Sequence, residues 1–354
     1  MKNKILLLSS LLVLGGLVSC GGEAESKVKV ALGYDASYEV YDHYNKLANC
    51  LTVNAAAVGF GEDGKILDVR FDSIQVYYGA TKAEGAEDWT YAPAKGLTND
   101  HGIKSKLELG KDYNMYNNPY GSTLSEVDTQ IEAFADLCVG KTVAEVEAIT
   151  EEQAAEVGVT IVYEMYVNAL KDAANKQRAA VAYTGELKAG VGMAGTFEKT
   201  YTGDIEASIT VSAGLVTGDK LVASYTDCVV YQTSGAVVNA EKNNNIELPG
   251  KEGQKYVVNG KITSKFDLGD AYGMAKYGTS TLEDPNAKAI EWDDQALAFD
   301  AVVAGKTVAE IEDLDFTAGV QAGITMHADD LVFAVTEAIT YANLVHVGPQ
   351  WNAE

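Results

Sequence analysis

The sequence contains one long unit twice, and this internal repeat restricts the fold more than any other feature. The segment SKLELGKDYNM at 105–115 returns 159 residues later as SKFDLGDAYGM at 264–274. Upstream, DGKILDVRFDSIQVYY at 63–78 matches GDKLVASYTDCVVYQ at 218–232. Repeats of this length are complete folding units rather than short solenoid turns, so the chain is expected to fold as two copies of one domain.

Each copy begins with a pattern that predicts an antiparallel hairpin. At 51–78, LTVNAAAVGF and ILDVRFDSIQVYY are apolar and β-branched runs that flank a Gly-Glu-Asp-Gly turn, and 205–232 repeats this arrangement around Thr-Gly-Asp. Apolar positions then return every three to four residues at 125–139 and 286–303, which predicts one amphipathic helix in each copy.

Gly-Lys-Thr follows each predicted helix, at 140–142 and 305–307. A phosphate-binding loop also needs a Gly five residues before this motif, and those positions are Ala135 and Asp300. A Gly just past a helix favours the left-handed end of that helix, and a Thr with Glu three residues later forms a capping box. The motif therefore predicts a corner between two helices.

These elements predict an α+β protein of two tandem homologous domains, each a small antiparallel sheet packed against two or three helices. The copies set the domain boundaries at 29–180 and 181–346, which leaves 347–354 as a tail.

The first residues have the pattern of an export signal. Lys2 and Lys4 precede an apolar run that is too short and too interrupted by Gly for a comfortable membrane span, and the run ends in Leu-Val-Ser-Cys at 17–20. This end resembles the lipobox of bacterial lipoproteins. The resemblance implies cleavage of a signal peptide at 1–19, lipidation of Cys20 and a flexible tether at 20–28, so the protein is expected at the cell surface.

The chain is strongly acidic, with a formal net charge of -24. Loss of residues 1–19 removes two lysines and no acid, so the mature charge is expected to be -26. Such a chain repels nucleic acid, and the charge is spread along the sequence as on a solvated surface. Cys50, Cys138 and Cys228 are expected as buried small side chains, with one disulfide as the alternative, and no Cys or His spacing indicates a metal site.

The end of each copy supplies a candidate cofactor site. Gly158 and Thr160 precede one apolar segment, and Gly323 and Thr325 precede its equivalent. A Thr at the start of a helix, beside a Gly that permits close approach, lies where backbone N–H groups favour a phosphate.

At these residues the chain resembles the FMN-binding domain family of secreted and lipid-anchored flavoproteins. In that family a Ser-Gly-Ala-Thr-like segment precedes a closing helix, and a flavin transferase can join its Thr to FMN. The resemblance implies covalent FMN on Thr160 and Thr325 and electron-transfer partners outside the membrane. The chain departs from the pattern, since Val157 and Ala322 replace the Ser, and Val159 and Ile324 replace the small Ala. The alternative is that both threonines are plain helix caps.

Four further polar positions match between the copies: Glu126 and Gln130 with Glu291 and Gln295. One helical turn separates each pair, so we expect a solvated helix face, with the lining of a cleft as the alternative. The position that matches Trp292 in the first copy is Val127, so the copies share no aromatic residue there that could stack on a cofactor. Trp292 is therefore expected to pack its helix against neighbouring elements.

Two function classes follow. The first is a lipid-anchored electron carrier with two FMN-binding-like domains and no enzymatic activity of its own. The second is a cofactor-free surface lipoprotein that binds a small molecule, a glycan or a partner protein. An enzyme with its own substrate chemistry is the third interpretation, because no catalytic constellation can be assembled from recurring positions.

Overall fold

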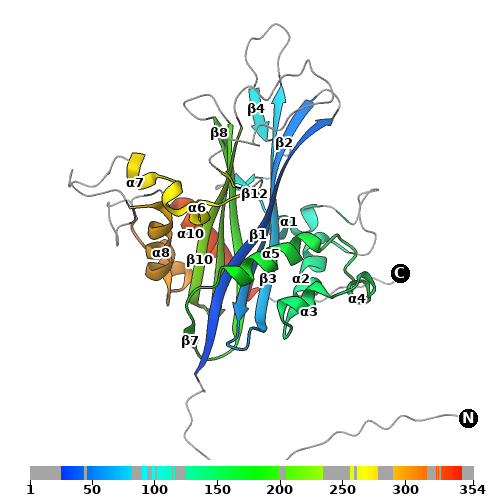
Figure 1. Cartoon of the computed structure of the whole chain (residues 1–354), viewed down its shortest axis with the longest axis vertical. Helices are drawn as coiled ribbons and strands as arrows, with labels where there is room; N and C mark the ends of the chain where they lie inside the picture. Colours follow the sequence, from blue (N-terminus) through cyan, green and yellow to red (C-terminus); the bar gives the residue numbers. More distant parts are fainter. Residues whose placement is uncertain are drawn as a thin grey trace, which may run out of the picture.

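A computed structural model describes residues 25–344, apart from 44–45, 82–89, 94–97, 100–101, 114, 116–124, 200–204, 234–255, 259–260, 278–289, 317–323, 325 and 327. Two five-stranded antiparallel sheets pack face to face, and helices cover the outer face of each sheet (Figure 1). The prediction of an α+β fold is therefore confirmed.

The first sheet has the strand order β4-β3-β2-β1-β7. Its strands are β1 (Ser26–His43), β2 (Lys46–Phe60), β3 (Ile66–Thr81), β4 (Thr90–Pro93) and β7 (Val181–Tyr183). The pairing of β2 with β3 confirms the first predicted hairpin.

The second sheet has the order β10-β9-β8-β6-β5, and a separate ribbon pairs β11 with β12. The strands are β5 (Thr98–Asn99), β6 (Gly102–Ile103), β8 (Leu187–Lys199), β9 (Ile205–Thr217), β10 (Lys220–Thr233), β11 (Val257–Val258) and β12 (Lys261–Ile262). The pairing of β9 with β10 confirms the second hairpin.

The helices follow the hairpins in each half. Those of the first half are α1 (Lys106–Leu109), the 3-10 turn η1 (Gly110–Tyr113), α2 (Val127–Cys138), α3 (Val143–Glu147), α4 (Glu151–Glu156) and α5 (Glu164–Asn175). Those of the second half are α6 (Lys265–Leu268), the 3-10 turn η3 (Gly269–Ala271), α7 (Met274–Tyr277), α8 (Trp292–Val303), α9 (Val308–Glu312) and α10 (Asp329–Asn343).

The strands of the sandwich are buried on both faces. In β2, Val53, Ala55 and Ala57 belong to the core between the sheets, whereas Ala56 and Val58 belong to the core under the helices of the first half. Side chains alternate between the two faces of a strand, so an unbroken apolar run such as 51–60 fits a strand with a layer on each side. The two halves therefore share one inner core.

Short strands also link the halves. The strand β6 comes from the first half of the chain but pairs with β8 in the second sheet. In turn β7, which follows the expected boundary at residue 180, pairs with β1 in the first sheet.

A polar cluster joins the halves beside these strands. The hydroxyl of Tyr34 donates a hydrogen bond to Asp267 at 2.7 Å and accepts one from the backbone N–H of Ser264 at 2.9 Å. The ammonium of Lys176 lies between the carboxylates of Asp172 and Asp267, at 2.8 and 2.5 Å. These contacts hold the C-terminal end of α5 against the second half.

The Gly-Lys-Thr corners have the predicted structure. Gly140 and Gly305 both have φ of 79°, and Thr142 and Thr307 each form a complete capping box with the Glu three residues later. The backbone N–H of Gly140 also donates to the carbonyl of Ile66 at 2.8 Å. Because the backbone donors of the motif are engaged within the protein, the corner does not bind phosphate as a nucleotide loop would.

Buried side chains account for the remaining predictions on packing. Trp292 is 4% exposed and packs in an apolar cluster with Cys228 and Ala296, so its predicted role in helix packing is confirmed. Cys50 and Cys138 are buried like Cys228, as small apolar side chains would be. In the described part of the chain, no helix is long and apolar enough to cross a membrane.

The closing helix of each half approaches one long strand of its sheet closely at a glycine, α5 over β1 and α10 over β8. A Cβ at Gly33 would lie 2.2 Å from the carbonyl oxygen of Ala169, and a Cβ at Gly192 would lie 2.0 Å from that of Ala334. Both neighbours are backbone atoms of a helix, which cannot move away as a side chain can. These two glycines set the distance between helix and sheet.

We therefore expect Gly33→Ala to lower the free energy of unfolding by about 2–3 kcal/mol, because the helix must shift away from the sheet. Gly59→Ala is the matched control, since its added methyl would meet only side chains, at 3.2–3.3 Å. Urea denaturation of both variants measures the difference. Equal stability of the two variants would contradict the proposed close approach.

Candidate functional site

The loop that carries Gly158 and Thr160 connects α4 to α5. Gly158 has φ of 89°, which lets the chain reverse after α4, and α5 begins at Glu164 with Tyr163 as its N-cap. Thr160 thus lies four residues before the helix. The prediction that it starts the helix is wrong, and so is the alternative that it caps the helix, because α5 begins only at Glu164 and its N-cap is Tyr163.

A buried glutamine holds this loop in place. Gln130 of α2 is 0% exposed, and its Oε1 accepts hydrogen bonds from the backbone N–H of Thr160 at 2.7 Å and of Ile161 at 3.0 Å. The hydroxyl of Thr160 also donates to this oxygen, at 3.0 Å. The Nε2 of Gln130 donates to the carbonyl of Ser125 at 3.0 Å, so both ends of the amide are bonded.

The second half repeats this arrangement. Gln295 is 1% exposed, its Oε1 accepts from the backbone N–H of Met326 at 3.0 Å, and its Nε2 donates to the carbonyl of Ile290 at 2.9 Å. The prediction that the two glutamines lie on a solvated helix face is therefore wrong. They recur because the closing loop of each half needs an acceptor for its backbone N–H groups.

The matched glutamates also bond to backbone. Glu126 accepts from the N–H of Met115 at 2.8 Å, and Glu291 accepts from that of Met274 at 2.9 Å. Each carboxylate thus holds the backbone of a methionine against the start of the helix that it caps. A structural role explains these positions without a ligand.

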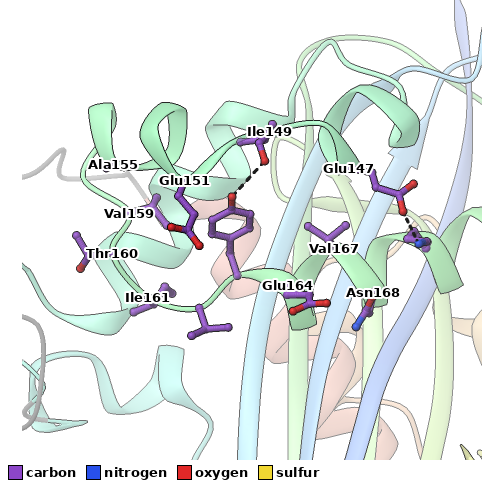
Figure 2. Close-up of a pocket in the computed structure, with 13 residues that line it drawn as sticks. Glu147, Ile149, Glu151, Ala155, Val159, Thr160, Ile161, Glu164, Val167 and Asn168 are labelled. Atoms are coloured by element: carbon purple, nitrogen blue, oxygen red, sulfur yellow. Dashed lines mark hydrogen bonds and ion pairs between the residues drawn. The ribbon is translucent and has the colours of Figure 1, made fainter.

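An open pocket of about 620 Å³ lies between the loop and the neighbouring helices. Its apolar wall comes from the loop and α5, with Val159, Ile161, Val162 and Val167, and Tyr163 contributes an aromatic ring. Figure 2 shows Thr160 at one end of the pocket and Asn168 of α5 toward the other. A volume of this size accommodates a small organic molecule.

Tyr163 is fixed within this wall. Its hydroxyl donates to the carbonyl of Ile149 at 3.2 Å, and its ring stacks on Phe134 of α2 with centroids 4.8 Å apart. Burial, followed by the nearby Glu151 and Glu152, raises the pKa of its hydroxyl. The ring is therefore held neutral and in one orientation.

The polar lining of the pocket is acidic. Glu147, Glu151 and Glu164 contribute three carboxylates, and Lys171 contributes one ammonium, which gives a formal net charge of -2. The ammonium lies 2.6 Å from Glu147, and both of these side chains are about half exposed. Glu151 and Glu164 therefore dominate the field inside the pocket.

The surroundings of Thr160 do not fit a bound phosphate. Its backbone N–H and that of Ile161 already donate to Gln130, and the pocket beside it is negative. A helix N-terminus that binds phosphate needs open N–H groups and tolerates no nearby carboxylates. The Thr160 side chain is nevertheless exposed, which covalent attachment would require.

The other predicted site residues lie outside the described part of the chain. These are Gly323 and Thr325 in the second half, and Cys20 with the signal segment. In the described residues, no group of three or more His, Cys, Asp or Glu side chains is placed to bind a metal ion.

A second matched set of polar groups is buried under the first turn of α1 and of α6. Asp72 accepts from the backbone N–H of Leu107 at 3.1 Å, and Asp227 accepts from that of Phe266 at 3.1 Å. Both carboxyl groups are almost fully buried. Burial raises the pKa of Asp72 to about 7 and that of Asp227 to about 6.

This burial makes stability depend on pH. The ordinary pKa of an unfolded Asp is about 3.9, so between about pH 4 and pH 7 the folded chain binds the proton on Asp72 more tightly than the unfolded chain does. The stabilising contribution of the protonated group is complete below about pH 4 and is lost as the pH rises to about 7.

Asp72→Asn removes the titrating proton but keeps a carbonyl acceptor for Leu107. From pH 5 to pH 8, we expect the free energy of unfolding of this variant to rise relative to the native chain by roughly 2 kcal/mol. Urea denaturation at both pH values measures this change. A difference between the two proteins that stays constant with pH contradicts the assignment.

The chain matches no family model, no curated protein and no solved structure. The similarity to the FMN-binding domain family accordingly rests on the residues quoted from the sequence.

Proposed function

We propose that this chain is an extracytoplasmic binding protein, anchored to the membrane through Cys20, whose pocket beside Thr160 takes a small organic cation with an apolar or aromatic body. The observation that carries this proposal is the composition of the pocket: apolar and aromatic walls on one side, and Glu151 and Glu164 as its dominant charges.

The charge of the pocket favours this ligand class. Glu151 and Glu164 are exposed, so a cationic group a few ångströms away gains at most about 1 kcal/mol from each. The ring of Tyr163 and the wall formed by Val159 and Val167 offer an apolar surface for the rest of the ligand. An anionic ligand would be repelled by the same carboxylates, and a purely apolar one would leave them without a counterion.

Tryptamine is a suitable probe, because it joins a primary ammonium to an indole ring. We expect it to bind the purified protein in isothermal titration calorimetry, and we expect its uncharged analogue tryptophol to bind at least ten-fold more weakly. Neutralising both acids, in Glu151→Gln/Glu164→Gln, should weaken tryptamine binding by about ten-fold or more.

The chain offers a matched control outside α4. Glu62 and Glu312 are exposed and do not line the pocket, so Glu62→Gln/Glu312→Gln removes the same total charge without changing the pocket. We expect this control to bind tryptamine nearly as tightly as the native protein. Equal losses in the two double variants would show that only the overall charge of the protein matters.

A second candidate function is a covalent-flavin electron carrier, as the family resemblance implies. One observation favours it: Thr160 is exposed on a loop that Gln130 fixes through two backbone hydrogen bonds. The fixed loop would hold the exposed Thr160 side chain in one orientation, and a flavin transferase would have to take its hydroxyl from the bond to Gln130. In this function FMN would supply the redox chemistry, and the chain would carry it at the cell surface.

The mass of the intact protein tests this candidate. The full chain is expressed with its signal in a host that has a flavin transferase, and the lipid mass expected on Cys20 serves as the internal sign of export. A carrier must show an FMN adduct and flavin absorbance, and Thr160→Ala must remove one adduct. A lipidated chain without flavin mass rejects the carrier and leaves the cation-binding function in place.

A further inference from the structure

Gln130 occupies an unusual place relative to the pocket. It does not line the pocket, yet its Oε1 accepts the backbone N–H groups of Thr160 and Ile161, two residues that do. The amide is fully buried, so water cannot replace it as an acceptor. The position of the pocket's loop wall thus depends on a side chain that the ligand cannot reach.

We propose that Gln130 is a positioning residue that determines the affinity of the pocket by fixing this loop. The inference rests on the proposed function of the pocket as a cation-binding site. The loop carries Val159, Ile161 and Tyr163, which form the apolar wall, and it leads directly into Glu164. Release of the loop would separate the apolar wall from the carboxylates and would add an ordering cost to binding.

The geometry also connects the pocket to the start of α2. The Nε2 of Gln130 donates to the carbonyl of Ser125 and lies 3.8 Å from the sulfur of Met115, while Glu126, one turn earlier, accepts from the backbone N–H of Met115. Gln130 therefore contacts Ser125 and Met115 at one end of its amide and the pocket loop at the other.

The chain supplies its own control for a test of this role. Gln295 makes the equivalent bonds to Met326 and Ile290 in the second half, and it is equally buried. Gln130→Met and Gln295→Met remove the same amide from equivalent buried positions, because Met has nearly the shape of Gln but offers only a weak acceptor. A general loss of stability would affect tryptamine binding in both variants.

The expected outcome is specific to the first half. In Gln130→Met, the amides of Thr160 and Ile161 exchange with deuterium at least ten-fold faster, and tryptamine binds at least ten-fold more weakly. In Gln295→Met, the amide of Met326 exchanges faster, whereas tryptamine binding and the Thr160 amide stay unchanged. Equal weakening of tryptamine binding in both variants overturns the proposal.

A second variant covers the case in which Gln130→Met does not fold. Gln130→Glu keeps an acceptor for Thr160 and Ile161, and its carboxyl, kept protonated by burial, can still donate to Ser125. The two loop amides should therefore remain protected, and tryptamine should bind no more weakly than to the native chain. Loss of binding with the loop still protected overturns the proposal.

The two proposals are separable. If native protein does not bind tryptamine, the proposed function fails, and amide exchange in Gln130→Met still shows whether this residue fixes the loop. If tryptamine binds and the Thr160 amide keeps its protection in Gln130→Met, the positioning role fails while the function stands.

Discussion

The burial of two sheets against each other is the constraint on which the rest of this structure depends. Strands from both halves contribute alternate side chains to one inner core, where the rings of Tyr38 and Tyr231 stack with centroids 3.9 Å apart. Neither sheet can expose that face to water without losing this apolar burial. The two copies in the sequence are thus joined into one folding unit, and the polar cluster around Tyr34 and Lys176 fixes their relative orientation.

Because the inner faces of both sheets are buried against each other, a binding site is expected in the outer helical layers. Each outer layer contains a helix after the hairpin, a capped corner and a closing helix that approaches the sheet at Gly33 or Gly192. In the first half, no residue of the connection from α4 to α5 belongs to the inner core, and Gln130 fixes its backbone. The loop can therefore form a pocket wall that is rigid and still open to solvent, as a binding site requires.

Features that depend on residues close together in the chain could be predicted from the sequence, whereas contacts between residues far apart in the chain could not. The corner at Thr142 could be predicted because the capping box lies within four residues. The role of Gln130 could not, because its partner Thr160 is 30 residues away and a matched polar pair on a helix more often faces water. The pocket could not be predicted from positions that recur in both copies, because its aromatic residue Tyr163 corresponds to Ala328 in the other copy.

The central claim is that the pocket beside Thr160 binds a small organic cation between an apolar wall and two carboxylates. A crystal structure of the protein with tryptamine tests it most directly. The account predicts the indole against Tyr163 and Val167, with the ammonium within hydrogen-bond distance of Glu151 or Glu164. Tryptamine bound elsewhere, or an empty pocket at a concentration that saturates the protein in solution, would contradict it.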